Sequence, residues 1–494
     1  MKRQTLFASL VAAGLLAACA SGPVSSPVVT GGSDLASQPL PANDGWAAAE
    51  GAVTGGIGAK AENRFTVTNR KELVAALTKG GKEPTIILVK GTINLSVDDN
   101  NKELTEKDYA VAPYDFNEYM KAYAPTVWNV KLEKGRPIRK LTGPQEEARA
   151  ASQSRQKARI VVQVPSNTSL IGLDKDAKIV KGNLVIGAGS ENVIIRNITF
   201  EDAFDYFPQW DPGDSFKIDA SYPGCQEAYV DATKGPQLCP GGRWNSEYDT
   251  ISINGGKRVW IDHCTFTEGD RTDDKFPPVF PFPHNEPTQK VQHHDGAVDV
   301  TNEADLVTIS YSLFKDHDKT NLIGGSDSRT SDAGKLRVTF HNNVFDNVGQ
   351  RMPRVRFGKV HTYNNLFVGD ATLADDPKAT AYENHRRVLS VPKPKGNIFR
   401  QALGAGKDSA IYSEANVFEI KNGSAEHAVG NMGGTKFFDA GSLVNGKPLD
   451  IKEAAGKPLS PDVGWKPTLY GNNKVKPAGE VPAYVRANAG AGKL

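Results

Sequence analysis

Five segments of the chain share one pattern of hydrophobic and polar positions. In each segment β-branched residues alternate with polar residues, and the segment closes on phenylalanine. A two-residue alternation predicts a β-strand with one face toward a core. The five segments are NVIIRNITF (192–200), RVWIDHCTF (258–266), LVTISYSLF (306–314), RVTFHNNVF (337–345) and KVHTYNNLF (359–367).

The spacing of the closing phenylalanines predicts how these strands are arranged. Phe345 and Phe367 are 22 residues apart, and the gaps before them are 31, 48 and 66 residues. A repeat of this length, with loop insertions in the longer gaps, indicates a parallel β-solenoid whose turns bury their faces by stacking. A β-sandwich with coincidental spacing is the alternative, but sandwich strands alternate in direction and do not place like residues at like intervals. We therefore predict an all-β parallel solenoid.

Two pairs of asparagines support the stacking of consecutive repeats. Asn342 and Asn364 occupy the same place in two repeats, and so do Asn343 and Asn365. Side-chain amides that stack in register form hydrogen-bonded ladders. We therefore predict amide ladders inside the coil.

A short helix is predicted before the first turn of the solenoid. We expect folding to start near Asp44. Asn69, with Glu72 three residues later, is typical of a helix start, here of KELVAAL, which ends at Gly80-Gly81. TIILVKGTINL then alternates as the first strand. A helix in this place would cover the otherwise open end of a solenoid.

Two segments break the repeat within a single predicted domain, 44–494. Residues 97–158 carry many charges and form an inserted excursion, in which Pro144 opens a helix. Strands resume after the insertion and run to about Phe418. Residues 440–494 are rich in Gly, Pro and Lys, so we expect them to wrap the surface as a tail.

The N-terminal segment has the features of an export signal. Residues 1–18 have a basic start and the apolar core LFASLVAAGLL, too short for a membrane span. They end in Leu16-Ala17-Ala18-Cys19, which resembles a bacterial lipoprotein cleavage site, whose cysteine becomes the acylated N-terminus. We predict lipid anchoring through Cys19 to the outer membrane or cell surface, with residues 19–43 as a flexible tether rich in Ser, Pro and Gly. The alternative is an ordinary signal peptide and a secreted protein.

The overall charge of the chain limits the kinds of binding partner that we expect. The chain has 59 basic and 57 acidic residues, and loss of residues 1–18 removes two basic residues and no acidic one. A near-neutral chain does not attract polyanions in bulk, so we expect no nucleic acid partner, and any binding of an acidic substrate must be local. Hydrophobic residues make up 39% of the chain, and no internal apolar run is long enough for a bilayer. We expect a monomer.

Three cysteines remain besides Cys19. Cys225 and Cys239 bracket a loop with Pro and Gly at both ends, whereas Cys264 takes an alternating position in a predicted strand that faces the core. Exported proteins meet oxidising surroundings, so we expect one disulfide, between Cys225 and Cys239, and one buried thiol. Sequence alone leaves other pairings open.

Charged residues recur between the predicted strands from residue 295 to residue 356. Asp295 and Asp299 lie four residues apart in HDGAVDV, and carboxylate oxygens are ligands that Ca²⁺ prefers. Lys319, Arg351 and Arg356 follow as fixed cations able to bind a carboxylate. The combination favours a cation-assisted attack on an acidic polymer.

The chain resembles the pectate lyases of the right-handed parallel β-helix type. The resemblance covers roughly residues 45–370, and several independent motifs occur in the right order. It implies a right-handed parallel β-helix and calcium-dependent cleavage of polygalacturonate, the de-esterified form of pectin. The matching stretches are GWAAAEGAVTGG, VTNRKELVAAL, VPSNTSLIG, IIRNITFEDAFDYFPQWDPGD, RWNSEYDTISI, VWIDHCTF, HDGAVDV, SYSLFKDHDKTNLIGGSD and QRMPRVRFGKVHTYNNLF.

The resemblance implies the metal ligands and the cofactor, Ca²⁺. Asp249 enters one predicted strand, and Asp295 and Asp299 flank the start of another, so neighbouring turns could converge on one cation. The implied ligands are Asp249, Asp295 and Asp299, with Glu247 as a candidate fourth.

The resemblance also implies the catalytic residues. Arg351 matches the family's proposed base, and Lys319 and Arg356 match its groups for the substrate carboxylate and the transition state. In the reaction, a β-elimination, a proton leaves C5 of a galacturonate and the C4 glycosidic oxygen departs, which gives a 4,5-unsaturated product. An arginine base needs a lowered pKa, which neighbouring cations favour, and a bound hydroxide is the alternative. We interpret Arg354 as a solvated basic edge.

Other charged groups are interpreted as structural. An acidic cluster lies before His293 and lacks the glycine of an EF-hand loop, so we predict a solvated loop and no metal site there. His263 and His341 lie within strands and are predicted to be structural. The acidic cluster consists of Glu268, Asp270, Asp273 and Asp274.

Three rival functions remain. A hydrolase would need paired carboxylates, but the candidates lie in a stretch that the lyase resemblance covers. A pectin lyase acts on the methyl ester, which lacks the charge that calcium bridges. A surface lipoprotein could hold polysaccharide without cutting it. The hydrolase candidates are Asp202, Asp205, Asp211 and Asp214.

The predicted anchor is tested by replacing Cys19 with serine. The variant should be released or mislocalised with unchanged turnover, because it loses the acyl chains and no part of the coil. Fractionation and mass spectrometry of the N-terminal peptide measure this. A soluble wild-type protein without acyl mass would favour the ordinary signal peptide.

Overall fold

The computed structural model describes residues 35–494 with gaps. The predicted export signal, the first part of the tether and Cys225 lie outside the described residues, as does the side chain of Cys239. The predicted disulfide therefore also lies outside them. The gaps are 82, 129–130, 134–135, 139, 214–216, 220–237, 241, 277–278, 281–289, 373–398, 453, 455–457 and 469–474.

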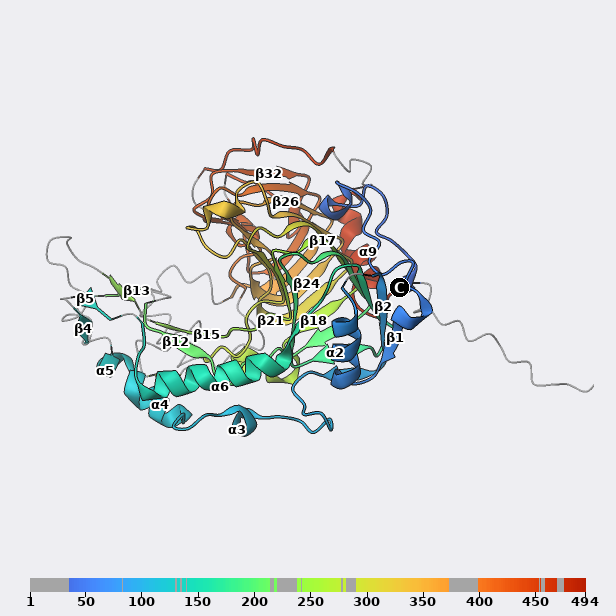
Figure 1. Ribbon diagram of the computed structural model, residues 1–494. Helices are drawn as coiled ribbons and strands as arrows, with labels where there is room; N and C mark the ends of the chain where they lie inside the picture. Colours follow the sequence, from blue (N-terminus) through green and yellow to red (C-terminus); the bar gives the residue numbers. More distant parts are fainter. Residues whose placement is uncertain are drawn as a thin grey trace, which may run out of the picture.

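Three long sheets wind around one core (Figure 1). The first sheet contains β1 (Arg64–Val67), β2 (Thr85–Val89), β7 (Thr168–Gly172), β10 (Glu191–Arg196), β17 (Lys257–Asp262), β20 (Asp305–Ser310), β23 (Arg337–His341), β26 (Lys359–Tyr363), β29 (Ala410–Glu414) and β32 (Phe437–Ala440). The second contains β3 (Thr92–Asn94), β8 (Lys178–Val180), β11 (Thr199–Glu201), β18 (Thr265–Thr267), β21 (Leu313–Lys319), β24 (Val344–Gln350), β27 (Leu366–Asp370), β30 (Val417–Lys421), β33 (Leu443–Val444) and β34 (Lys447–Pro448). The third contains β6 (Val161–Gln163), β9 (Asn183–Gly187), β16 (Ile251–Asn254), β19 (Val298–Thr301), β22 (Leu322–Ile323), β25 (Arg354–Val355), β28 (Leu403–Gly406) and β31 (Val429–Met432).

Each coil contributes one strand to each sheet in turn. β17, β18 and β19 form one coil, β20, β21 and β22 form the next, and their strands pair in parallel. Like positions align from coil to coil: Ile261 pairs with Ile309, and Ile309 pairs with Phe340. The predicted right-handed parallel β-helix is confirmed.

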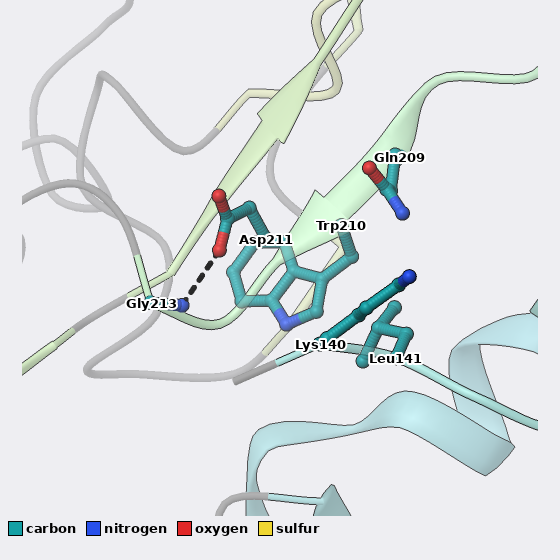
Figure 2. A pocket seen from close by; sticks show the side chains of 6 residues that line it. All are labelled: Lys140, Leu141, Gln209, Trp210, Asp211 and Gly213. Carbon is teal, nitrogen blue, oxygen red and sulfur yellow. Dashed lines mark hydrogen bonds between the residues drawn. The ribbon is translucent and has the colours of Figure 1, made fainter. Parts of the chain in front are cut away.

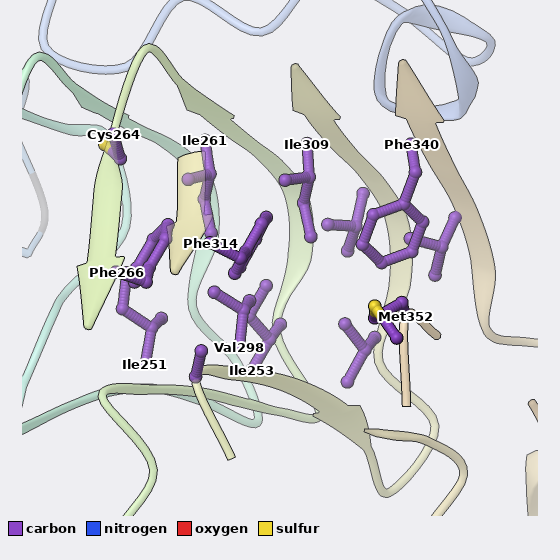
Figure 3. Packing of buried hydrophobic residues seen from close by; sticks show 14 of the residues in the cluster. Ile251, Ile253, Ile261, Cys264, Phe266, Val298, Ile309, Phe314, Phe340 and Met352 are labelled. Atoms are coloured by element: carbon purple, nitrogen blue, oxygen red, sulfur yellow. The ribbon is translucent and has the colours of Figure 1, made fainter. Parts of the chain in front are cut away.

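The closing phenylalanines stack in one row inside the coil. Neighbouring rings lie 4.6–5.3 Å apart and are tilted by 3–13°. Figure 3 shows two of them, Phe266 and Phe314 of the second sheet, packed among isoleucines and valines of the first and third sheets. Burying each ring stabilises the fold by about 2 kcal/mol. The row consists of Phe200, Phe266, Phe314, Phe345, Phe367 and Phe418.

An asparagine ladder crosses the same coils. Asn343 donates its backbone N–H and its side-chain amide to Asn365 Oδ1 at 2.9 and 3.0 Å, and Asn365 repeats both bonds to Asn416 Oδ1. The predicted ladder is confirmed for this pair and extends to Asn416. Asn342 and Asn364 instead turn the chain at φ of 54° and 52°, a conformation that asparagine tolerates well.

The predicted helices are present. α2 (Arg70–Lys79) begins at Asn69, whose side chain accepts from the Glu72 N–H at 3.0 Å, and ends at Gly80. α6 (Pro144–Ile160) has Pro144 in its first turn, where the missing N–H costs no hydrogen bond. Near the C-terminus of the chain, α9 (Val481–Asn488) packs on the outside of the second sheet.

The long excursions leave the coil at one corner, between the second and third sheets. The insertion separates β3 from β6, a second excursion separates β11 from β16, and a third separates β18 from β19. In Figure 1 they form a lobe beside the coil, with α6 along its base. Their aromatic side chains share one cluster, which includes Tyr119, Trp210, Trp244 and Phe280. Elements of the lobe are α3 (Glu106–Tyr109), α4 (Phe116–Tyr123), α5 (Pro125–Trp128), β4 (Leu132–Glu133), β5 (Arg136–Pro137), β12 (Gln209–Asp211), β13 (Lys217–Asp219), β14 (Leu238–Pro240) and β15 (Arg243–Asn245).

Two predicted boundaries are wrong. Ala36 and Leu40 are 1% and 2% exposed against apolar side chains on the outer face of the first sheet, so the flexible tether predicted over 19–43 does not reach residue 43. The coil also continues past Phe418 to Val444 through β31, β32 and β33. Short strands such as LGAG and VGNM lack the alternation that marks the earlier coils.

Two further features bear on the sequence predictions. No helix in the described residues is long and apolar enough to cross a bilayer. Cys264 is a fully buried free thiol, as predicted, and its burial raises the pKa of the thiol to about 12.

The asparagine ladder predicts the effect of one substitution. Asn365→Ala should lower the free energy of unfolding by about 3 kcal/mol, because it leaves the buried N–H groups of Asn343 without an acceptor. Urea unfolding followed by circular dichroism measures the change, with Asn117→Ala, at an exposed position of α4, as the control. Equal losses in the two variants would contradict the ladder's contribution.

Candidate active site

Four consecutive coils deliver charged residues to the corner between the second and third sheets. Adjacent strands of a sheet lie about 4.8 Å apart, so residues at equivalent places in successive coils come within reach of one another. In coil order these residues are Asp249 before β16, Asp295 and Asp299 around the start of β19, Lys319 at the end of β21, and Arg351, Arg354 and Arg356 around β25.

Gly296 lies between two of the carboxylates. A Cβ on Gly296 would come within 2.4 Å of Asp299 Oδ1 and 2.9 Å of Asp249 Oδ1. The Gly296 N–H donates to Asp249 Oδ1 at 2.9 Å, and the Leu322 N–H donates to Asp299 Oδ1 at 2.9 Å. The two carboxylates therefore converge on a space that only glycine leaves open.

The three aspartates differ in their electrostatics. Burial raises the pKa of Asp249 to about 7, with a further contribution from Asp295, and burial together with repulsion from Asp249 raises the pKa of Asp299 well above its usual value. Burial also acts to raise the pKa of Asp295, but attraction to Lys319 and Arg351 outweighs it, and that pKa is lowered. In the described part of the chain neither Asp249 nor Asp299 forms an ion pair. When ionised, the pair therefore carries negative charge that no direct ion pair within the described residues neutralises.

Glu247, the candidate fourth ligand, contacts a lysine of α6. Its side chain is exposed, and its carboxylate lies 3.6 Å from Lys157 Nζ. Its backbone N–H donates to Asp205.

Lys319 reaches the acidic group from the next coil. Its side chain is 2% exposed, and Nζ lies 2.9 Å from Asp295 Oδ1 and 3.2 Å from Gln292 Oε1. An ammonium has three donors, and these two contacts leave one for a ligand.

Arg351 is held in a strained backbone conformation. Its φ is +61°, in the left-handed region that costs a non-glycine residue about 1–2 kcal/mol. Its carbonyl oxygen accepts from the Thr320 hydroxyl at 2.9 Å and the Asn321 N–H at 2.6 Å, which fixes the turn. Within the described residues the buried Nε has no hydrogen-bond partner.

The other two arginines flank Val355, whose side chain is in the core. Arg356 donates from Nε to Asp327 Oδ1 at 2.6 Å and from a terminal nitrogen to the Gly324 carbonyl at 3.0 Å. Arg354 is half-buried, and burial together with Arg356 and Arg351 lowers its pKa to about 10. Arg354 is therefore not a fully solvated edge as interpreted from the sequence, because its side chain is partly buried and its Nε is shielded from solvent.

Sequence reasoning missed a further cation beside the site. Arg243 on β15 helps Lys319 and Arg351 to lower the pKa of Asp295 against the opposing effect of burial, and its guanidinium donates to Asn245 Oδ1 at 2.5 Å. The available signal was a basic residue in RWNSEYD, six positions before Asp249. It belongs to an excursion whose path the repeat does not define.

The predicted solvated acidic loop is wrong for two of its members. Glu268 and Asp273 are fully buried, whereas Asp270 is exposed and the side chain of Asp274 lies outside the described residues. Glu268 Oε1 lies 3.1 Å from His317 Nδ1, and Asp273 Oδ1 lies 2.8 Å from His294 Nδ1. Histidines from later segments thus compensate the charge, which a loop sequence does not reveal.

Ligand-type atoms of Glu268, Asp273 and His294 lie within 4.8 Å of one another. His294 also contacts Asp202 Oδ1 through Nε2 at 3.1 Å. Burial opposes the charged form, but Asp273 and Asp202 outweigh it and raise the pKa of His294 to about 10. An imidazolium that donates from both nitrogens has no lone pair for a metal. The group is therefore a buried ion cluster.

The two strand histidines have structural contacts. His263 stacks on Tyr311 at 4.8 Å, and His341 stacks on Tyr363 at 4.9 Å. His341 Nε2 also lies 2.9 Å from Asp44 Oδ1, which ties the N-terminal segment to β23.

A separate pocket of about 410 Å³ lies in the lobe, as Figure 2 shows. It contains none of the predicted site residues, and its lining carries one positive and one negative side chain. The corner described above brings together Asp249 and Asp299, which form no ion pair within the described residues, and several cations, so we place the candidate site there. The pocket is lined by Lys140, Leu141, Gln209, Trp210, Asp211 and Gly213.

The fold and this corner define a parallel β-helix enzyme with carboxylates and guanidinium groups side by side. A family model described as pectate lyase matches residues 3–115, 138–234 and 226–494. A pectate lyase of Bacillus subtilis (strain 168) is 42% identical over 95% of this chain and 96% of its own length. Pectate lyase A of Dickeya chrysanthemi is 33% identical over 91% of this chain and 88% of its own length.

Solved structures agree. An arginine-to-lysine mutant of Bacillus subtilis pectate lyase superposes with a TM-score of 0.76 at 41% identity, over 93% of this chain and all of that one. A pectate lyase bound to a hexasaccharide superposes with a TM-score of 0.75 at 41% identity, over the same shares of the two chains. The chain belongs to the pectate lyase family.

The ion cluster predicts a pH-dependent contribution to stability. His294→Gln should lower the free energy of unfolding by about 3 kcal/mol near pH 7, because it leaves buried carboxylates without their cation. The pKa of His294 is raised from 6.5 to about 10, so its contribution is complete below 6.5 and is lost as the pH rises through about 10. Urea unfolding of both proteins at about pH 7 and about pH 10.5 measures this. A deficit of the same size at both pH values would mean that His294 is not charged.

Proposed function

We propose that the protein cleaves polygalacturonate by calcium-dependent β-elimination and releases 4,5-unsaturated oligogalacturonides. The carrying observation is the convergence of Asp249 and Asp299 at Gly296, beside the cations Lys319 and Arg351. Membership of the pectate lyase family supports the reaction class, and the hexasaccharide-bound relative supports an oligosaccharide as ligand.

The residues at the corner fit a hard divalent cation. Their ligand atoms are carboxylate oxygens, and Gly296 keeps the space between Asp249 and Asp299 open. Burial and repulsion from neighbouring carboxylates raise the pKa values of Asp249 and Asp299, so a bound cation would stabilise their ionised form. Asp249, Asp295 and Asp299 would hold Ca²⁺. When bound, the ion would neutralise the uronate carboxylate and so acidify the neighbouring C5 proton.

The cations supply binding and charge stabilisation for the substrate. The free donor of Lys319 would bind the uronate carboxylate and stabilise the negative charge that develops on it as the C5 proton leaves. Arg356 would bind a carboxylate with its planar fork, held in place by Asp327. These groups are fixed before the substrate arrives, which lowers the cost of reorganisation.

Arg351 is the proposed base. Its strained, anchored backbone aims the side chain from the coil after that of Lys319, and Arg354 and Arg356 lie within the same turn of chain. Burial, together with repulsion from Arg356 and Arg351, lowers the pKa of Arg354 to about 10, so the surroundings of Arg354 disfavour its protonated form. Alkaline conditions would therefore favour the reaction, whether the proton passes to Arg351 or to a bound hydroxide.

The rival functions fit the structure less well. The hydrolase candidates Asp202 and Asp205 are buried, Asp202 between His294 and Arg271 and Asp205 in bonds to Gln153 and to backbone N–H groups. They do not flank an open cleft as an acid and base pair must. The carboxylates at Gly296 favour a cation bridge to a charged uronate over the uncharged methyl ester of a pectin lyase substrate.

We further propose, from the sequence, that the enzyme is exported and lipid-anchored through Cys19 as a monomer. A Cys225–Cys239 disulfide would staple the excursion that begins after β12, beside the site. Anchoring would place a rigid coil where it meets a polymer too large to enter the cell.

The proposed reaction is tested on de-esterified polygalacturonate with and without chelator. The ultraviolet absorbance of the unsaturated product should rise with calcium and vanish without it. Gly296→Ala should lose most of this activity, because its Cβ would fill the space between Asp249 and Asp299, while Gly479→Ala, at an open position, should retain it. New reducing ends without absorbance would indicate hydrolysis, and full activity in chelator would remove calcium from the mechanism.

The proposed base is tested by Arg351→Lys. Turnover should fall by a factor on the order of a thousand with binding largely kept, because lysine retains the charge but not the planar fork or its reach. Steady-state kinetics on polygalacturonate measures this, with Arg155→Lys at an exposed position of α6 as the control. Normal turnover in Arg351→Lys would remove Arg351 from the chemistry.

A further inference from the structure

Gln292 lies between the active-site lysine and a buried carboxylate. Gln292 is buried, with 2% of its surface exposed. Oε1 accepts from Lys319 Nζ at 3.2 Å, and Nε2 donates to Asp318 Oδ2 at 3.1 Å. The amide therefore connects the two neighbouring residues of β21 across the corner.

Asp318 fixes which way the amide points. It is 2% exposed and pairs with Lys290 Nζ at 3.2 Å and with an Arg400 terminal nitrogen at 2.8 Å. Burial opposes ionisation, but Lys290 and Arg400 outweigh it and hold the pKa of Asp318 well below its usual value. An ionised carboxylate only accepts hydrogen bonds, so the NH₂ of Gln292 must face Asp318 and its carbonyl oxygen must face Lys319.

This fixed carbonyl determines where the lysine can point. The Lys319 side chain is 2% exposed, so bulk water does not compete for its ammonium. One N–H of the Lys319 ammonium donates to Asp295 and a second donates to Gln292. Because the ammonium is tetrahedral, these two bonds fix the direction of its third N–H. Without Gln292, Lys319 would be free to close fully onto Asp295.

We propose that Gln292 is a positioning residue that orients Lys319 toward the uronate carboxylate. This inference rests on the role of Lys319 in the proposed function. A glutamine suits the position because a glutamate would face ionised Asp318 and would add a second negative charge to Lys319, in competition with the substrate. Misplacing a charge-stabilising group by about 1 Å costs on the order of a hundredfold in rate.

The test is a double-mutant cycle between Gln292→Leu and Lys319→Ala, with kcat and KM measured on polygalacturonate at saturating calcium. Gln292→Leu alone should lower kcat by a factor on the order of ten to a hundred, with a smaller change in KM, because the interaction acts in the transition state. In the Lys319→Ala background the same substitution should change kcat by less than about twofold.

The matched control is Gln156→Leu. Gln156 is 1% exposed and also makes two side-chain bonds, to the Phe204 carbonyl and from the Tyr206 N–H, but it does not contact Lys319. It should lose stability with kcat unchanged. If Gln292→Leu does not fold, Gln292→Asn, whose shorter amide does not span both partners, replaces it in the cycle.

The outcomes separate the inference from the proposed function. A severe loss in Lys319→Ala together with normal kcat in Gln292→Leu would overturn the inference alone. Equal losses from Gln292→Leu in both backgrounds would show that Gln292 acts independently of Lys319 and would overturn it as well. Full activity of Lys319→Ala would overturn the proposed role of Lys319 and the inference with it.

Discussion

In-register parallel stacking of the coils is the constraint on which the rest of the structure depends. Because like positions align between coils, one phenylalanine per coil becomes the row from Phe200 to Phe418, and one asparagine per coil becomes the ladder from Asn343 to Asn416. The same register carries outward-facing residues of four coils to a single corner. The core and the site both depend on the same register, so a slip in the pairing of the strands would disrupt both.

Many charged side chains lie at the corner, and the neighbours of each one determine whether its charge is neutralised. Lys319 forms an ion pair with Asp295, and histidines lie against Glu268 and Asp273, while Asp249 and Asp299 form no ion pair in the described residues. The long excursions leave the coil at this same corner and pack into a lobe beside it. Partial desolvation strengthens every electrostatic interaction there, which would support the charge stabilisation that the proposed elimination needs.

The sequence predicted what the repeat controls and missed what the excursions control. The coil, the phenylalanine row, the cap on α2 and the grouping of Asp295, Asp299 and Lys319 follow from periodic spacing and a family resemblance. The burial of Glu268 and Asp273 did not, because their partners His317 and His294 arrive from other segments, and an acidic loop without its partners looks solvated. Arg354 was misjudged for a related reason, since its exposure depends on neighbouring coils.

Direct measurement of Ca²⁺ binding tests the central claim, that stacked coils create a cation site between Asp249 and Asp299. Isothermal titration of the wild-type enzyme and of Asp299→Asn, without substrate, separates binding from catalysis. The structure predicts Ca²⁺ binding by the wild type and its loss, with the fold intact, in the variant. Equal binding by both proteins, or none by the wild type, would contradict the site.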